Sequence, residues 1–228
     1  GAALAACTTG GANTAVGYMA LTTCTTQGYN TAVGRAALYN CIAESCTGVG
    51  YQALLATTTG ADNTAVGYNA MTANTTGNAC VAMGNAALDA NTTGANHTAI
   101  GSAALSKCTT GDKNCAVGRS AAYELTDGSD NTAVGSYAGM NMTGCDANTC
   151  FGYSAGISLT TGSTNVCIGN QAGQNQVDTG SNSLYIARVL LVLVMLDVGL
   201  MVVLQELAIK VIIKLLGQQL LTEDLRKI

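Results

Sequence analysis

The chain has 228 residues and a formal net charge of −4, and only 10% of its residues are charged and 4% aromatic. Compact globular domains carry about 25% charged residues, and proteins that bind nucleic acid gather Lys and Arg on one face. The composition therefore argues against an ordinary globule and against nucleic acid as a partner.

A recurring glycine anchors a repeat that fills most of the chain. The spacing is 17 residues, except for one step of 16 between Gly34 and Gly50. A short period held over many copies is typical of a solenoid. Because Gly1 falls partway through a coil, we expect the chain to be a fragment or a processed product. The anchor glycines are Gly17, Gly34, Gly50, Gly67, Gly84, Gly101, Gly118, Gly135, Gly152 and Gly169.

Each coil is predicted to contain a short strand followed by turns. Thr-Ala-Val segments have the alternation of a pleated strand, the anchor glycine permits a bend, and Thr-Thr-Gly carries turn chemistry. Residues 1–187 are therefore expected to form an all-β parallel β-solenoid (a β-roll or β-helix) of about ten coils. Coils about 4.8 Å apart make a rod roughly 48 Å long.

Three further columns describe the cross-section of a coil. The position three residues after the anchor glycine is always Ala, and the position four residues before it is usually Asn, which suits a buried amide ladder. The residue just before the anchor glycine is always apolar and is predicted to form the core column. This column contains Val16, Val33, Val49, Val66, Met83, Ile100, Val117, Val134, Phe151 and Ile168.

The strands are apolar or small on both faces, which points beyond a single chain. Ala65 and Val66 are neighbours and face opposite ways in a strand. One set fills the interior of the coil, and the other needs a second cover. Three chains around a common axis supply that cover, so we expect a homotrimer; a lone, wide solenoid with a two-sided inner strand is the alternative.

The repeat resembles known fibre proteins. Asn-Thr-Ala-Val-Gly-Tyr-x-Ala with Asn-Thr-Thr-Gly is similar to the repeats of phage and prophage tail-fibre proteins and to the coils of trimeric autotransporter (YadA-like) adhesin heads. The resemblance covers residues 1–187. It implies an elongated homotrimer, extracellular or on a virion surface, that serves attachment to a host glycan or protein and is not an enzyme.

The composition changes at Arg188, where Gly, Asn and Thr give way to Leu, Val and Ile. Residues 188–228 are predicted to form a helical stalk or capping segment, because apolar residues recur at helical spacing in the second half and open solenoid ends need caps. A transmembrane helix is disfavoured, since the apolar run is short and contains Asp197. β structure is the third alternative.

Cysteine, histidine and aspartate are the residue types of this chain that could carry chemistry. Ten cysteines are predicted to act as small fillers, with disulfides such as Cys7–Cys24 or Cys24–Cys41 as the alternative. His97 takes an Asn position and has no recurring partner, so no catalytic, cofactor or metal site is expected. Four aspartates are read as solvated turns, with calcium binding as the alternative: Asp62, Asp112, Asp130 and Asp146.

Two exposed columns are candidates for ligand contact. Adjacent threonines suggest an ice-binding solenoid as the rival function, with Thr58, Thr75, Thr92 and Thr109 as the candidate ligand face. The threonines are adjacent, so only one of each pair faces outward in a strand, and the pair runs into a Gly turn. Tyr18, Tyr51, Tyr68 and Tyr153 follow anchor glycines; stacked packing is expected, with glycan contact as the alternative.

Overall fold

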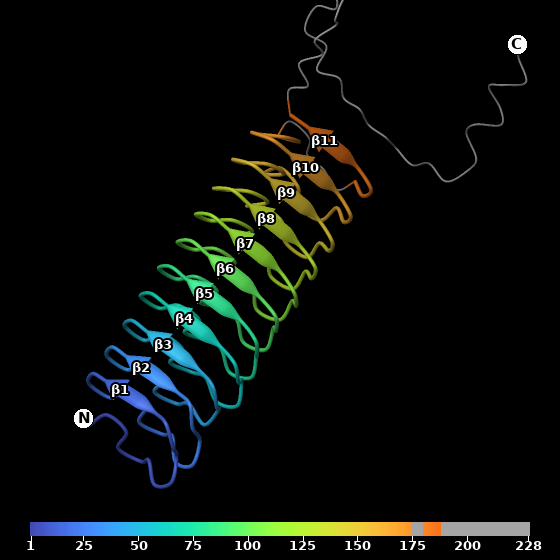
Figure 1. Ribbon diagram of the computed structural model, residues 1–228. Coiled ribbons are helices and arrows are strands. Elements are labelled where there is room, and N and C mark those ends of the chain that lie inside the picture. Colours follow the sequence, from blue (N-terminus) through green and yellow to red (C-terminus); the bar gives the residue numbers. More distant parts are fainter. Residues whose placement is uncertain (175–179, 188–228) are drawn as a thin grey trace, which may run out of the picture.

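The computed structural model describes residues 1–174 and 180–187, which wind into a stack of similar coils (Figure 1). Each strand has three residues: β1 (Thr14–Val16), β2 (Thr31–Val33), β3 (Thr47–Val49), β4 (Thr64–Val66), β5 (Val81–Met83), β6 (Thr98–Ile100), β7 (Cys115–Val117), β8 (Thr132–Val134), β9 (Thr149–Phe151), β10 (Val166–Ile168) and β11 (Leu184–Ile186). Over these residues the prediction of an all-β parallel β-solenoid is confirmed. The predicted helical tail, 188–228, lies outside the described residues.

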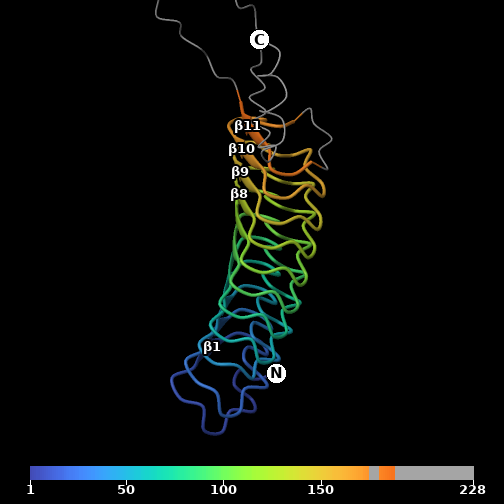
Figure 2. The same ribbon diagram turned by 90° about the vertical axis from the view of Figure 1, so that its right-hand side faces the viewer.

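The strands form one parallel sheet of eleven strands, and the order in space is the order in the chain. Equivalent residues pair, so that Val49 lies beside Val66 and Ala65 beside Ala82. The 16-residue step keeps this register, with Thr31 beside Thr47, because the missing residue falls in a turn. A slip of one residue in a strand would have exchanged its two faces. Figure 2 shows the coils piled into one rod.

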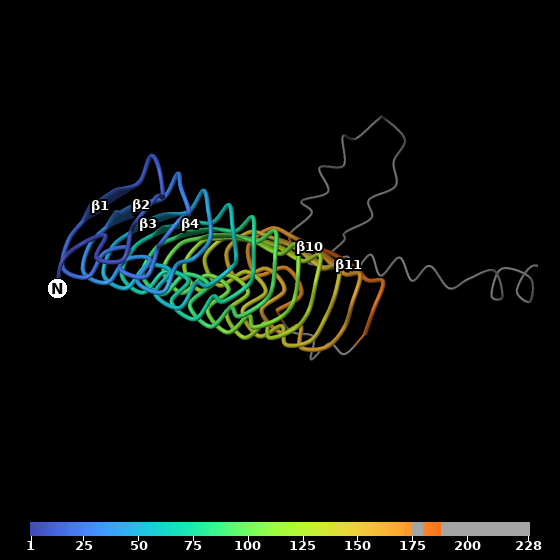
Figure 3. The ribbon, with the colours of Figure 1, turned by 90° about the horizontal axis from the view of Figure 1, so that it is seen from below.

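The interior of each coil is narrow and is filled mainly by small side chains. The middle residue of most strands is fully buried, as at Ala32 and Ala65, and so is the alanine three residues after the anchor glycine, as at Ala70. Leu38 and Leu88 supply bulk at the level of their coils. The view from below shows the coils as a series of similar loops that follow one another along the rod (Figure 3).

The predicted core column lies outside the coil, which corrects the sequence prediction. Val16 is 59% exposed and Phe151 is 56% exposed, and the rest of this column is exposed or half-buried. Alternate residues of a strand point to opposite faces, and the interior accepts the middle Ala of Thr-Ala-Val. The first and third residues then face outward. The sequence prediction assigned the larger apolar residue to the core, whereas the narrow coil admits the smaller one.

The anchor glycines bring successive coils into close contact. Gly67 has φ of 142°, a conformation that side-chain-bearing residues rarely adopt. A Cβ there would also lie 2.7 Å from the carbonyl carbon of Gly84 in the next coil and would collide with its oxygen. Glycine is therefore required at this position both by backbone conformation and by the spacing between coils.

The bulky core residue changes position partway along the rod. In the first six coils it is the fourth residue after the anchor glycine: Leu21, Leu38, Leu54, Met71, Leu88 and Leu105. In the next three coils that position is Ala122, Gly139 or Gly156, and a large residue three positions later is buried instead: Leu125, Met142 or Leu159. A Cβ at Gly156 would lie 3.1 Å from Leu159 Cδ1. Each of these nine coils therefore buries one large side chain, either from the fourth or from the seventh residue after the anchor glycine.

Candidate functional site

The asparagine column forms a buried ladder that ties each coil to the next. Asn131 is 1% exposed, and its Nδ2 donates to the Cys145 carbonyl at 2.7 Å. Its Oδ1 accepts from the backbone N–H of Asn148 at 3.0 Å, and Asn148 repeats the pattern toward Asn165. Buried polar groups need such partners, so the predicted amide ladder is a structural element of the interior.

His97 and two cysteines replace asparagine in this ladder and keep part of its bonding. Nδ1 of His97 accepts from the backbone N–H of Asn114 at 3.2 Å. The thiol of Cys80 donates to the Gly94 carbonyl and its sulfur accepts from the His97 N–H; Cys46 donates to the Gly60 carbonyl in the same way. Burial lowers the pKa of His97. The imidazole therefore serves as a neutral ladder member.

The ten cysteines are free thiols, and eight of them are buried. Burial raises the pKa of Cys108 to about 12 and that of Cys145 to about 11, so neither forms a thiolate readily. Within residues 1–174 and 180–187, no three side chains of His, Cys, Asp or Glu gather as metal ligands would. The aspartates of the turns are exposed, and Asp112 accepts from the backbone N–H of Ala95 in the preceding coil.

The candidate threonine face is half-buried, and its hydroxyl hydrogens are used between coils. Thr58 donates to the Thr75 carbonyl at 3.0 Å, and Thr75 donates to the Thr92 carbonyl at 2.9 Å. Thr92 and Thr109 continue the series with bonds of 3.1 Å. The column therefore contributes to the wall of the solenoid, which leaves it poorly suited to bind a ligand through those hydrogens.

The outer face of the sheet is a surface that repeats at every coil. Each strand presents its first and third residues there, mostly a Thr and an apolar residue. No residue of the eleven strands is charged. Exposed apolar side chains on this face include Val33, Met83 and Ile168. Exposed apolar residues that recur along a surface are typical of interaction sites, so this face is a candidate interaction surface.

A second surface lies where the tyrosine column follows the anchor glycines. Rings of Tyr51 and Tyr68 are stacked, with centroids 5.0 Å apart and an interplanar angle of 9°. Arg35 takes the equivalent position between Tyr18 and Tyr51, with its guanidinium carbon 5.8 Å and 5.3 Å from the two ring centroids. Stacking between coils is thus observed for this pair. The sequence analysis missed Arg35, although its place in the tyrosine column was a usable signal.

Comparison with protein families, curated proteins and solved structures gives no match for this chain. The part of the chain that the structure describes contains no helix long and apolar enough to cross a membrane. The class defined by the fold is therefore that of parallel β-solenoid repeat proteins, with an uncharged sheet face and a tyrosine–arginine stack as its two candidate surfaces.

Proposed function

We propose that the chain is a non-enzymatic structural module of an attachment fibre, either a phage tail fibre or a bacterial surface fibre. In this role it assembles with two further copies of itself, outside the cell or on a virion. It would hold a binding element away from the particle or cell. The observation that carries the proposal is the uncharged, partly apolar sheet face that runs along a rod.

Stiffness along the rod supports this role. Backbone bonds join consecutive coils at several points around the circumference, including Thr64 N–H to Cys80 O at 2.8 Å, Met71 N–H to Ala87 O at 3.0 Å and Thr75 N–H to Thr92 O at 2.9 Å. The asparagine ladder adds side-chain bonds inside the coil. Such a rod resists bending and offers few unpaired backbone groups to proteases.

A second copy of this chain is the best match for the sheet face. The face repeats once per coil, so a partner that contacts every level needs the same rise. Fully burying a Val or Ile side chain contributes about 1.5–3 kcal/mol; residues here are already partly covered, so each level would contribute about 1 kcal/mol. Because the strands carry no charged residue, the sheet faces of two copies can approach without like charges meeting there.

The mass of the full chain in solution tests the proposal. We expect sedimentation equilibrium to give three times the chain mass. Val66→Asp combined with Val117→Asp places two carboxylates on the outer face and should give monomers that keep the far-ultraviolet spectrum of the solenoid. Thr76→Asp combined with Thr93→Asp, both on exposed turns, is the charge-matched control and should stay trimeric. A monomeric natural chain, or a double variant that still forms trimers, would refute the assembly.

Ice binding is the second candidate, and the observation that favours it also concerns the outer sheet face. Thr64 and Val66 project outward from one strand, and Thr132 and Val134 repeat the pair four coils later. Ranks of Thr and Val at a regular spacing, on a sheet without charge, can order water in a lattice-like array. This face replaces the adjacent-threonine column as the candidate ice-binding surface, because the hydroxyls of that column are bonded to backbone.

The two candidates make opposite demands on the same face, since assembly buries it and ice binding needs it free. Thermal hysteresis of the purified full chain distinguishes them. Activity in a monomeric protein that is lost in Val117→Asp and kept in Thr76→Asp would favour ice binding. A trimer without hysteresis would favour the fibre.

A further inference from the structure

We propose that the tyrosine–arginine stack of the first four coils binds an acidic saccharide, through a carboxylated sugar residue seated beside Arg35. The stack consists of Tyr18, Arg35, Tyr51 and Tyr68, one residue from each coil. The inference depends on local geometry and not on assembly into a fibre. It adds a binding activity to the shaft of the rod.

Arg35 is held in place but keeps most of its hydrogen-bonding capacity. Its guanidinium lies between the rings of Tyr18 and Tyr51, and Nη1 donates to the Tyr51 hydroxyl at 2.9 Å. Guanidinium has five N–H donors in a planar fork that matches a carboxylate. Because the side chain is exposed and already oriented by two rings, little rotational freedom would be lost on binding.

The charge of Arg35 is not neutralised by an acid within the described part of the chain. The ion pair there joins Lys107 and Glu124 at 2.7 Å. Lys107 also lies over a tyrosine ring, Tyr123, at 5.1 Å, but its charge is paired with a carboxylate. The guanidinium of Arg35 is therefore available to pair with an anion. The chain as a whole has a net charge of −4. An anion would therefore be attracted by the guanidinium of Arg35 itself and not by the overall charge of the protein.

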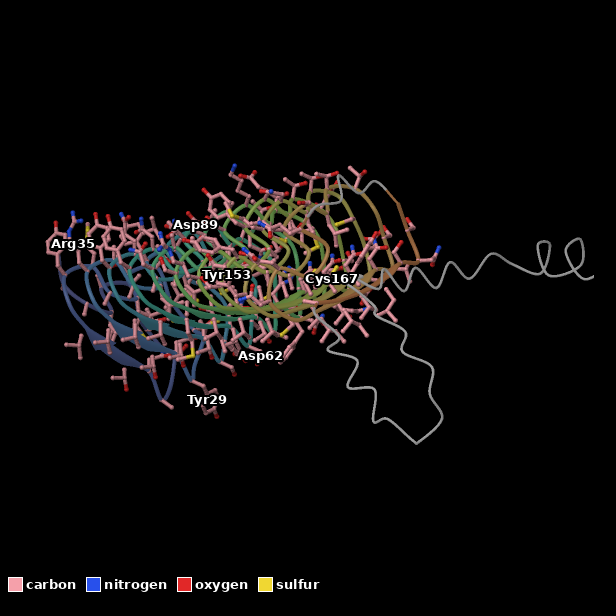
Figure 4. The ribbon with its side chains drawn as sticks, turned by 90° about the horizontal axis from the view of Figure 1, so that it is seen from above. Tyr29, Arg35, Asp62, Asp89, Tyr153 and Cys167 are labelled. Carbon is pink, nitrogen blue, oxygen red and sulfur yellow. The ribbon has the colours of Figure 1, made fainter. Side chains whose placement is uncertain are left out.

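A shallow depression adjoins the guanidinium. It has a volume of about 190 Å³ and is lined by Tyr18, Met19, Arg35, Ala36, Tyr39, Gln52 and Leu55. The depression is smaller than the sites of drug-sized ligands. Its walls are mostly apolar, so it suits the C–H face of a single sugar ring. Figure 4 shows Arg35 at the N-terminal end of the rod, on the opposite side from Tyr29.

The side chains around the depression match the parts of a carboxylated sugar. Tyr18 is 51% exposed and offers an aromatic face to the C–H groups of a pyranose ring. Arg35 would bind the carboxylate through two parallel N–H donors. A neutral sugar would gain the stacking but leave the guanidinium unpaired, which makes the acidic form the preferred ligand.

Titration of the full chain with methyl glucuronide tests the assignment, with methyl glucoside and acetate as matched probes. Tyrosine fluorescence reports directly, because the chain has no Trp. We expect millimolar affinity for the glucuronide and at least tenfold weaker binding of both other probes. Arg35→Gln should weaken glucuronide binding at least tenfold, and Tyr18→Ala should weaken both sugars.

Arg119→Gln is the control, because Arg119 is a second exposed arginine beside a tyrosine, 5.5 Å from the Tyr137 ring, and carries the same charge. Its affinity for glucuronide should equal that of the natural chain. Equal losses in the two arginine variants would reduce the effect to general electrostatics and overturn the proposal. Acetate binding as tight as glucuronide, or equal affinity for glucuronide and glucoside, would also overturn it. Circular dichroism of each variant confirms that the fold is intact.

Discussion

The exchange of the bulky core residue between two positions predicts that the two positions are energetically coupled. Leu125 is fully buried, and its Cδ1 lies 2.8 Å from where a Cβ on Gly128 would be. Backbone bonds between coils prevent the walls from collapsing around a cavity, so Leu125→Ala should destabilise the protein by about 4 kcal/mol. Ala122→Leu alone should overpack the coil and cost about 2 kcal/mol.

The double variant, Ala122→Leu with Leu125→Ala, restores the arrangement seen in the preceding coil, where Leu105 occupies the earlier position. Leucine can adopt the left-handed backbone needed there, since Leu105 has φ of 51° and Ala122 has φ of 49°. We expect the double variant to lose only about 2 kcal/mol, against a sum of about 6 kcal/mol, which gives a coupling energy of about 4 kcal/mol.

Urea unfolding followed by circular dichroism measures these losses. Repeat arrays can unfold in parts, so hydrogen exchange at the Ala122 amide, which donates to the Ala138 carbonyl at 2.9 Å, reports on this coil directly. Leu125→Ala with Gly156→Leu places the added volume in the wrong coil and should be additive. A double variant at positions 122 and 125 that is as unstable as the sum of its single changes would refute the reasoning.

Three more predictions concern an anchor glycine and two buried titratable groups. Gly67→Ala should lower the free energy of unfolding by more than about 3 kcal/mol, because the new Cβ adds backbone strain and collides with the next coil. Gly11→Ala, with no atom near the new Cβ, should change it by at most about 0.5 kcal/mol. Equal urea midpoints for the two variants would contradict this prediction. His97→Asn should stabilise the protein more at pH 5 than at pH 8. The lowered pKa of His97 supplies stability that is present above its unfolded pKa of about 6.5 and is lost as the pH falls; a gain independent of pH would refute it. The pKa of Cys108 is raised from 9.0 to about 12, so its contribution to the free energy of unfolding is present below pH 9.0 and is lost as the pH rises toward 12. Cys108→Ser should therefore reduce the loss of stability at alkaline pH, when the free energy of unfolding is measured from pH 8 to 11.

The direction of the sheet faces was the main point that sequence reasoning placed wrongly. A strand of Thr-Ala-Val shows alternation, but alternation does not say which face is inside. Ala65 faces the interior, where it belongs to one buried cluster with Leu54 and Met71. The interior has little spare room at this level of a coil, because a Cβ at Gly48, which pairs with Ala65, would already lie 3.1 Å from Leu38 Cγ. Val66 therefore lies on the outer face of the strand. The sequence analysis predicted that one face of the strand would need a second cover, but it assigned the column of Val66 to the core.

The candidate binding site required contacts that span several coils. The tyrosine column was visible in the sequence, but Arg35 looked like a deviation from it. Its significance came from two rings in neighbouring coils, from the Tyr51 hydroxyl and from the absence of a nearby carboxylate. None of these contacts follows from the residue types alone, because they depend on the side-chain conformations in three successive coils.

The sequence by itself determined the solenoid, its parallel register and the positions that must be glycine. A period of 17 residues can repeat only if every coil takes the same path, and a close stack leaves no room for a Cβ between Gly67 and Gly84. Only the tertiary structure decided which apolar column is buried and which large residue fills each coil. Those choices depend on the width of the interior, and this width arises from both walls of the coil together.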